Sequence, residues 1–238
     1  MATREQPPQS PPPVQRLQVR YCKRGRARFT SHRDVARALE RALRRADIPM
    51  AYSSGFNPHP RISYAGASAT GAATEADYLE LGLARSCDPG WVRDAMSAAL
   101  PEGIDVLEVV ERGIGEPSLT DRLEASTWQI AVAGPSHDVA RRAVAAALAA
   151  ASLPVERLTK NGVRQFDARP AVLALEAPEA GTILATLRQE VPLVRPDDVV
   201  QALGRVEPDF VLASAALYAR LDQGLYRDGR IVSPFEKP

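Results

Sequence analysis

Two kinds of periodicity alternate along the first half of this chain. Residues 16–22 alternate between polar and apolar, which is typical of a half-buried strand. Ser31 is a good helix N-cap with Asp34 three residues later, and apolar residues follow at helical spacing. Asp88 and Pro89 begin a second helix. Further strands are expected at residues 62–64, 78–83 and 104–111. The resulting order is that of a ferredoxin-like domain: strand, helix, strand, strand, helix, strand.

The second half repeats this order. Ser136 caps a helix, Asn161 and Gly162 favour a tight hairpin turn, and a short helix follows Pro196 and stops at Gly204. Strands are expected at residues 127–132, 172–175, 183–187 and 210–221. A chain of 238 residues is long enough for two modest domains. We therefore predict an α+β fold made of two tandem ferredoxin-like (βαββαβ) halves.

The predicted organisation has four parts. They are a disordered, proline-rich tail over residues 1–14, a first ferredoxin-like domain with a basic helix over residues 15–113, a second ferredoxin-like domain over residues 123–221, and a C-terminal tail over residues 222–238.

Positive charge is concentrated at the start of the chain. The first 66 residues contain thirteen Lys or Arg against four Asp or Glu, whereas the whole chain has a formal net charge of only +1. The remaining residues are therefore net negative. A chain that separates its charge in this way builds one positive surface, and the natural counterpart of such a surface is a polyanion such as RNA.

The helix expected after Ser31 carries five arginines on the side away from its apolar residues: Arg33, Arg37, Arg41, Arg44 and Arg45. One acid, Glu40, cannot neutralise them, and like charges one turn apart repel each other. Two interpretations follow. Either acids from elsewhere in the chain pair with these arginines, or the arginines bind phosphates. In the second case the surface is extended by the basic residues of the adjacent strand and turn, which are Arg20, Lys23, Arg24, Arg26 and Arg28.

A proline-stiffened segment, Asn57-Pro58-His59-Pro60-Arg61, follows this helix. We expect His32, Asn57, His59 and Arg61 to shape the specific part of the RNA site. His32, at the helix start, and His59 are the candidate catalytic residues, because two imidazoles near a phosphodiester can act as general base and general acid toward an RNA 2′-hydroxyl. The alternative is a structural role for both. A smaller basic group surrounds the expected hairpin in the second half: Arg157, Lys160, Arg164 and Arg169.

Several kinds of chemistry have no signature in the sequence. Cys22 and Cys87 form neither a disulfide framework nor a metal motif. We find no phosphate-loop lysine pattern, no dinucleotide-binding glycine motif and no hydrolase motif. Apolar runs fall short of the ~20 residues that a membrane span needs, and the start lacks the apolar region of a signal peptide. We therefore expect a cytoplasmic protein with no cofactor, no metal site and no membrane association.

Part of the chain resembles the radical-SAM-linked protein family, a domain of unknown function. The resemblance covers residues 16 to about 85 and rests on three stretches: Gly25-x-Ala27-Arg28-Phe29-x-Ser31-His32-x-Asp34, Glu40-Arg41-Ala42-Leu43-Arg44-Arg45-Ala46, and the run from Tyr52 through Gly55-Phe56-Asn57-Pro58-His59-Pro60-Arg61 to Ala65. Members of that family occur alone or fused behind a cobalamin-binding radical SAM enzyme. The resemblance implies a companion module, since this chain lacks the Cys-x-x-x-Cys-x-x-Cys motif that would hold an iron–sulfur cluster.

The charge pattern and the resemblance together predict an RNA-binding accessory module. We expect it to bind structured RNA such as tRNA or rRNA and to work with an RNA-modifying, RNA-processing or radical SAM enzyme. One alternative is a metal-independent endoribonuclease that uses His32 and His59. The other is a protein-docking adaptor for a radical SAM partner. Whether the chain is an enzyme stays open, with binding favoured over catalysis.

Overall fold

The computed structural model describes residues 9–113, 116–160 and 162–236. The chain divides into two compact units, unit 1 up to Arg122 and unit 2 over Leu123–Glu236. The fold is mixed α and β, with four α-helices among the described residues. No helix in that part of the chain combines the length and the apolar character that a membrane span requires.

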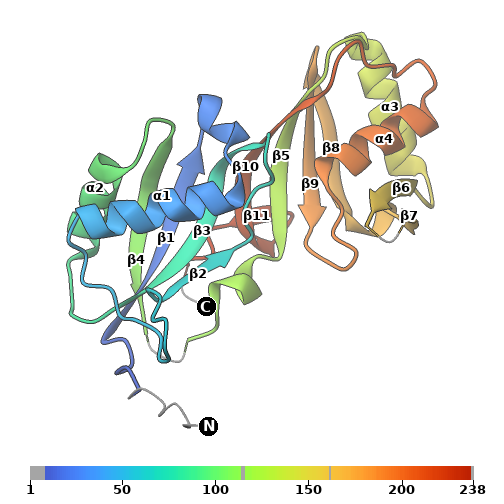
Figure 1. Ribbon diagram of the computed structural model, residues 1–238. Coiled ribbons are helices and arrows are strands. Elements are labelled where there is room, and N and C mark those ends of the chain that lie inside the picture. Colours follow the sequence, from blue (N-terminus) through green and yellow to red (C-terminus); the bar gives the residue numbers. More distant parts are fainter. Residues whose placement is uncertain (1–8, 114–115, 161, 237–238) are drawn as a thin grey trace, which may run out of the picture. The chain divides into compact units, whose positions relative to one another are not determined.

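Unit 1 contains an antiparallel sheet covered on one face by two helices (Figure 1). Its strands are β1 (Gln15–Lys23), β2 (Ile62–Ala65), β3 (Ala73–Leu83) and β4 (Ile104–Arg112), in the spatial order β4-β1-β3-β2. The helices are α1 (His32–Arg45) and α2 (Pro89–Ala99). A short 3₁₀ turn, Gly25–Phe29, links β1 to α1, and another, Leu119–Arg122, closes the unit.

The core of unit 1 lies between this sheet and its helices. Val35, Leu39 and Leu43 of α1 belong to the same buried cluster as Val92 and Met96 of α2. The strands contribute every second residue to it, among them Leu17, Val19, Leu79, Leu81 and Leu83. Because strand side chains alternate between faces, the residues in between point to the opposite face of the sheet.

Capping fixes both ends of α1. Ser31 accepts a hydrogen bond from the Asp34 N–H at 3.2 Å and donates its hydroxyl to the Asp34 carboxylate at 2.7 Å, so the predicted N-cap is confirmed. At the other end Asp47 adopts a left-handed conformation with φ +52°. The next N–H, that of Ile48, donates to the Leu43 carbonyl at 3.1 Å, which is the main bond of a Schellman motif.

The main strands of unit 2 also pair in antiparallel fashion. Its strands are β5 (Ala125–Ala131), β8 (Val172–Glu179), β9 (Thr182–Arg188) and β10 (Leu217–Arg227), in the order β10-β5-β9-β8, with β11 (Arg230–Val232) paired to β10. The helices are α3 (His137–Ala149) and α4 (Pro196–Val206). A separate hairpin, β6 (Pro154–Thr159) and β7 (Gly162–Asp167), precedes the 3₁₀ turn Arg169–Ala171.

The two ends of the chain differ from the sequence expectation. Residues 222–238 were expected to form a tail, but β10 continues to Arg227 and turns into β11. Asp228 and Gly229 both have positive φ, +49° and +80°, as a type I′ hairpin turn requires. At the start, the Ser10 N–H donates to Ser54 Oγ at 2.9 Å, within the expected tail. Residues 1–8 of that tail and Asn161 of the expected hairpin turn lie outside the described residues.

Candidate nucleic-acid interface

The five arginines of α1 form one exposed stripe, which we call the arginine stripe: Arg33, Arg37, Arg41, Arg44 and Arg45. With 3.6 residues per turn they fall within an arc of about 120° and extend over about 18 Å of the helix axis. The buried side of the same helix packs on the sheet. The stripe therefore points away from the core of unit 1.

Carboxylates from the rest of the chain leave most of this stripe unpaired. Arg37 lies 3.5 Å from Asp34 one turn away, and both side chains are more than half exposed. Arg45 donates to the Ala99 carbonyl at 3.1 Å. The guanidinium groups of Arg33, Arg41 and Arg44 make no hydrogen bond or ion pair with any residue in the described ranges. An exposed pair such as Arg37–Asp34 contributes little, so the stripe keeps nearly all of its charge.

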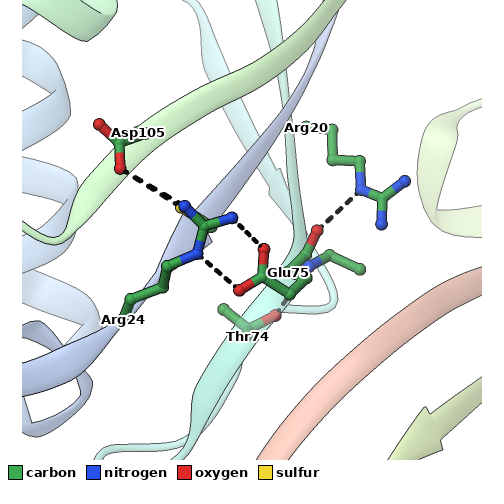
Figure 2. Close-up of polar contacts among 7 residues, drawn as sticks. Arg20, Arg24, Thr74, Glu75 and Asp105 are labelled. Carbon is green, nitrogen blue, oxygen red and sulfur yellow. Dashed lines mark hydrogen bonds and ion pairs between the residues drawn. The ribbon is translucent and has the colours of Figure 1, made fainter.

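The basic residues at the end of β1 have different surroundings (Figure 2). Arg24 donates to both oxygens of the Glu75 carboxylate, at 2.7 and 2.5 Å, and lies 3.9 Å from Asp105. The hydrogen bonds that Arg24 donates to the Glu75 carboxylate raise the pKa of Arg24. The Nε of Arg20 donates to the backbone carbonyl of Glu75 at 2.7 Å. Lys23 is only 2% exposed, and its ammonium donates to the Ala69 carbonyl at 3.2 Å. The charge of Arg24 is thus balanced within unit 1, and Lys23 does not extend the surface.

Arg26 and Arg28 lie in the 3₁₀ turn just before α1. Arg26 is exposed and makes no hydrogen bond or ion pair with the described residues. Arg28 donates to the Gly71 carbonyl at 2.8 Å, which ties the turn to the loop before β3. Its guanidinium lies 5.2 Å from the ring centroid of Phe29, whose side chain is 65% exposed. An exposed aromatic ring therefore flanks the start of the arginine stripe.

The segment with two prolines forms an ordered loop. The Ser53 N–H donates to the His59 carbonyl at 2.8 Å, and the His59 N–H donates to Ser53 Oγ at 3.0 Å. Arg61 donates from Nε to the Tyr52 carbonyl at 3.1 Å, which closes the base of the loop. The side chains of Asn57, His59 and Arg61 are all exposed. The loop therefore holds these residues at the surface, as the sequence analysis expected of a site.

His32 and His59 have separate environments. The His32 ring meets the Tyr64 ring edge to face at a centroid distance of 5.1 Å. Burial, with a smaller effect from the negative charge of Glu40, raises the pKa of the Tyr64 hydroxyl. His59 precedes Tyr64 by five residues, which span up to about 16 Å of extended chain. The described contacts thus give His32 an aromatic partner and give His59 backbone partners. They show no contact between the two imidazoles among the described residues.

Strand register also separates Arg61 from the arginine stripe. Ile62 and Tyr64 of β2 pack against the core beneath α1. Because strand side chains alternate, Arg61 and Ser63 point to the opposite face of the sheet. A Cβ added at Gly82 would lie 3.2 Å from the Arg61 Cβ, so Arg61 and Gly82 share that face. On β1, the strand on the other side of β3, Arg16 is the cross-strand partner of Gly82. No motif in the sequence pointed to Arg16.

The smaller basic group of unit 2 is partly used in packing. Arg157 forms an ion pair with the buried carboxylate of Asp198 and lies over the Phe166 ring at 5.0 Å. Arg169 donates to the backbone carbonyls of residues 148, 150 and 172. Lys160 and Arg164 are exposed. Within the described residues, no three His, Cys, Asp or Glu side chains gather in a way that could hold a metal ion.

Comparison with known proteins identifies the family. Residues 16–196 match the model of a family described as "Uncharacterized protein conserved in bacteria (DUF2344)". No curated protein matches the chain. Among solved structures, the chain is similar to one described as "Crystal Structure of an Unknown Protein from Galdieria sulphuraria", with 19% sequence identity, coverage of 87% of this chain and 98% of that chain, and a TM-score of 0.25. Since the family model spans most of the sequence, the chain belongs to the DUF2344 family.

Proposed function

We propose that this member of the DUF2344 family binds structured RNA, such as tRNA or rRNA, through the arginine stripe of α1. It would act as an accessory to an RNA-modifying, RNA-processing or radical SAM enzyme. One observation carries the proposal. Five guanidinium groups are exposed along one side of a single helix, and three of them have no partner among the described residues.

The geometry of the stripe suits a phosphate backbone. Arg33, Arg37, Arg41 and Arg45 follow one another at four-residue spacing, which is about 6 Å along the helix axis. Each guanidinium can bind a phosphate through two parallel hydrogen bonds. Like charges at this spacing repel each other in the free protein, and bound phosphates would relieve that repulsion. Such contacts recognise the backbone and shape of folded RNA and carry little sequence information.

Phe29 offers a complementary contact. Single-stranded bases in loops and bulges stack on exposed aromatic rings, often with an arginine beside the ring. Phe29 is exposed, carries the Arg28 guanidinium over its face and is separated from α1 by two residues. An unpaired base could stack here while the stripe holds the neighbouring phosphates.

The order of the strands within each unit supports the expected pair of ferredoxin-like domains. Unit 1 has the element order βαββαβ and the spatial order β4-β1-β3-β2. Unit 2 gives the equivalent order, β10-β5-β9-β8, once the β6–β7 hairpin is treated as an insertion. This architecture hosts many functions, so the RNA proposal depends on the stripe and not on the fold.

Charge reversal on the stripe tests the proposal. We expect Arg37→Glu, Arg41→Glu and Arg44→Glu together to lower the affinity for bulk tRNA by roughly tenfold or more at moderate salt, because phosphate contacts supply most of such affinity. The matched control reverses Arg141, Arg164 and Arg230, three exposed arginines of unit 2 whose guanidinium groups make no hydrogen bond or ion pair with the described residues.

Filter binding measures both triple variants, and circular dichroism verifies their folding. The control should bind within threefold of the unmodified protein. Equal losses in the two variants would mean that net charge alone governs binding, and an unchanged affinity in the α1 variant would refute the proposal.

The two alternative functions have their own tests. An endoribonuclease that depends on His32 and His59 would cleave RNA in the presence of EDTA and lose that activity in His32→Ala or His59→Ala. An adaptor would co-purify with a radical SAM enzyme after nuclease treatment, because no RNA would bridge the two proteins.

A further inference from the structure

The sheet face opposite α1 carries a second set of arginines. Cross-strand neighbours lie side by side on one face. One row of cross-strand neighbours in the unit 1 sheet consists of Arg112 on β4, Arg16 on β1, Gly82 on β3 and Arg61 just before β2. Three arginines and one glycine thus form a row across the sheet, on the face that the arginine stripe does not reach.

Gly82 leaves a hollow between two of these arginines. The hollow has a volume of about 290 Å³, and Arg16 and Arg61 line it together with Pro13, Ser63 and Glu80. A Cβ at position 82 would lie 3.1 Å from the Pro13 Cβ and 3.2 Å from the Arg61 Cβ, so a side chain there would fill the floor. Adjacent strands are about 4.8 Å apart, which places the stems of Arg16 and Arg61 about 10 Å from each other.

The charges on the two sides of the hollow are largely unused. The guanidinium of Arg16 makes no hydrogen bond or ion pair with the described residues. Arg61 uses its Nε for the Tyr52 carbonyl, which leaves its two terminal nitrogens available. Arg112 differs, because it donates to Gln18 at 3.1 Å and lies 3.5 Å from Glu116.

Next to the arginines, Glu80 provides the hollow with hydrogen-bond acceptors. Its Oε1 accepts hydrogen bonds from the Gln18 amide at 2.8 Å and from the Leu119 N–H at 3.3 Å. Its other oxygen has no hydrogen bond to the described residues. A free inorganic anion would use only the arginine side. A phosphate attached to a sugar would use both sides, because ribose hydroxyls can donate to Glu80 and Ser63.

We propose that this hollow binds a phosphomonoester carried on a nucleoside, with Arg16 and Arg61 clamping the phosphate and Glu80 accepting from the attached sugar. A phosphomonoester carries about −1.5 to −2 charges at neutral pH, which matches two guanidinium groups. The hollow is also of nucleotide size, close to the lower end of the usual range for ligand pockets. The source of this group is either a free nucleotide or a phosphorylated RNA end.

Calorimetric titration of the full chain tests this site. The probes are adenosine 5′-monophosphate, adenosine, inorganic phosphate, and one short RNA with either a 5′-phosphate or a 5′-hydroxyl. We expect adenosine monophosphate to bind at least tenfold more tightly than adenosine or inorganic phosphate. A similar preference for the 5′-phosphorylated RNA would identify an RNA end as the source. Equal binding of the two RNAs would identify the free nucleotide.

Three variants locate the binding. Arg16→Gln, Arg61→Gln and Gly82→Ala should each weaken adenosine monophosphate binding by roughly tenfold, whereas Arg230→Gln should leave it unchanged. If Gly82→Ala proves unstable, the two arginine variants decide the question. The triple reversal on α1 should leave nucleotide binding within twofold, so a failed RNA proposal and a failed nucleotide site give different results. Absence of binding to the unmodified protein, or equal binding by all variants, would overturn the inference.

Discussion

Arginine side chains of the first 66 residues differ in role because their neighbours differ. Arg24 is held by the carboxylates of Glu75 and Asp105, whereas Arg41 makes no ion pair with the described residues. The two cannot be told apart in the sequence, since Glu75 follows Arg24 by 51 residues and meets it only when β3 pairs with β1. Local spacing predicted the arginine stripe, but it could not show which of the other arginines are balanced.

Asp47 offers a test of the capping of α1. Its φ of +52° is unfavourable for a residue with a side chain, and its carboxylate lies at the negative end of the helix dipole. We expect Asp47→Gly to raise the free energy of unfolding by about 0.5 to 1 kcal/mol. Asp47→Ala, which removes the carboxylate but keeps the Cβ, should give a smaller gain or a loss. Urea denaturation measures both variants. Equal stability of the Gly and Ala variants would contradict this role of backbone conformation.

At the level of elements, helices with local signals were predicted most accurately. The sequence placed the N-caps of three helices at Ser31, Asp88 and Ser136, and all three are observed. Strand limits depend on pairing partners and were less accurate. β10 was expected over residues 210–221 but begins at Leu217, because its partner β5 pairs only from that residue onward. The Asp228-Gly229 turn was a local signal for a further hairpin that the sequence analysis did not use.

Register explains why the candidate site was only partly predictable. Arg61 follows Asn57 and His59 closely in sequence, and it was expected to shape the specific part of the RNA site together with them. The pairing of β2 with β3 turns Arg61 to the opposite face, beside Gly82 and Arg16. A shift of one residue in this pairing would reverse the faces, and no local pattern in such a short strand reveals it.

Glu124 provides a test of how the β10–β11 hairpin is held. The Arg227 guanidinium and the Tyr226 N–H both donate to its carboxylate, and they lower the pKa of Glu124 below its ordinary value of 4.5. This interaction therefore stabilises the fold above pH 4.5 and is lost as the pH falls through the folded-state pKa. Because the carboxylate is 40% exposed, solvent screens the effect and we expect it to be modest.

The urea concentration at the midpoint of unfolding, determined at pH 7 and at pH 3, measures this contribution of Glu124 to stability. We expect the difference between the two midpoints to shrink in Glu124→Gln. It should not change in Glu102→Gln, which alters an exposed carboxylate with no ion pair to the described residues. The same pH dependence in the unmodified protein and in Glu124→Gln would contradict a stabilising role for this contact.

On the scale of the whole molecule, charge separation occurs mainly inside unit 1. Residues 67–122 contain eleven Asp or Glu against four Lys or Arg, whereas the rest of the chain after them is nearly balanced. Pairing of the α1 arginines with acids from the rest of the chain was one of the two interpretations of the sequence. Some of them serve Arg24 and Arg112 instead. Others, such as Glu108 and Glu111, are exposed on the edge strand β4, where charge discourages pairing with other chains.

The salt dependence of RNA binding tests the central claim most directly. Each phosphate contact releases counterions, so the logarithm of the binding constant falls linearly with the logarithm of the salt concentration. We expect the slope for bulk tRNA to become shallower by about two to three when Arg37, Arg41 and Arg44 are changed together to Gln, roughly one per lost contact. An unchanged slope in that variant would show that the α1 arginines do not contact phosphates.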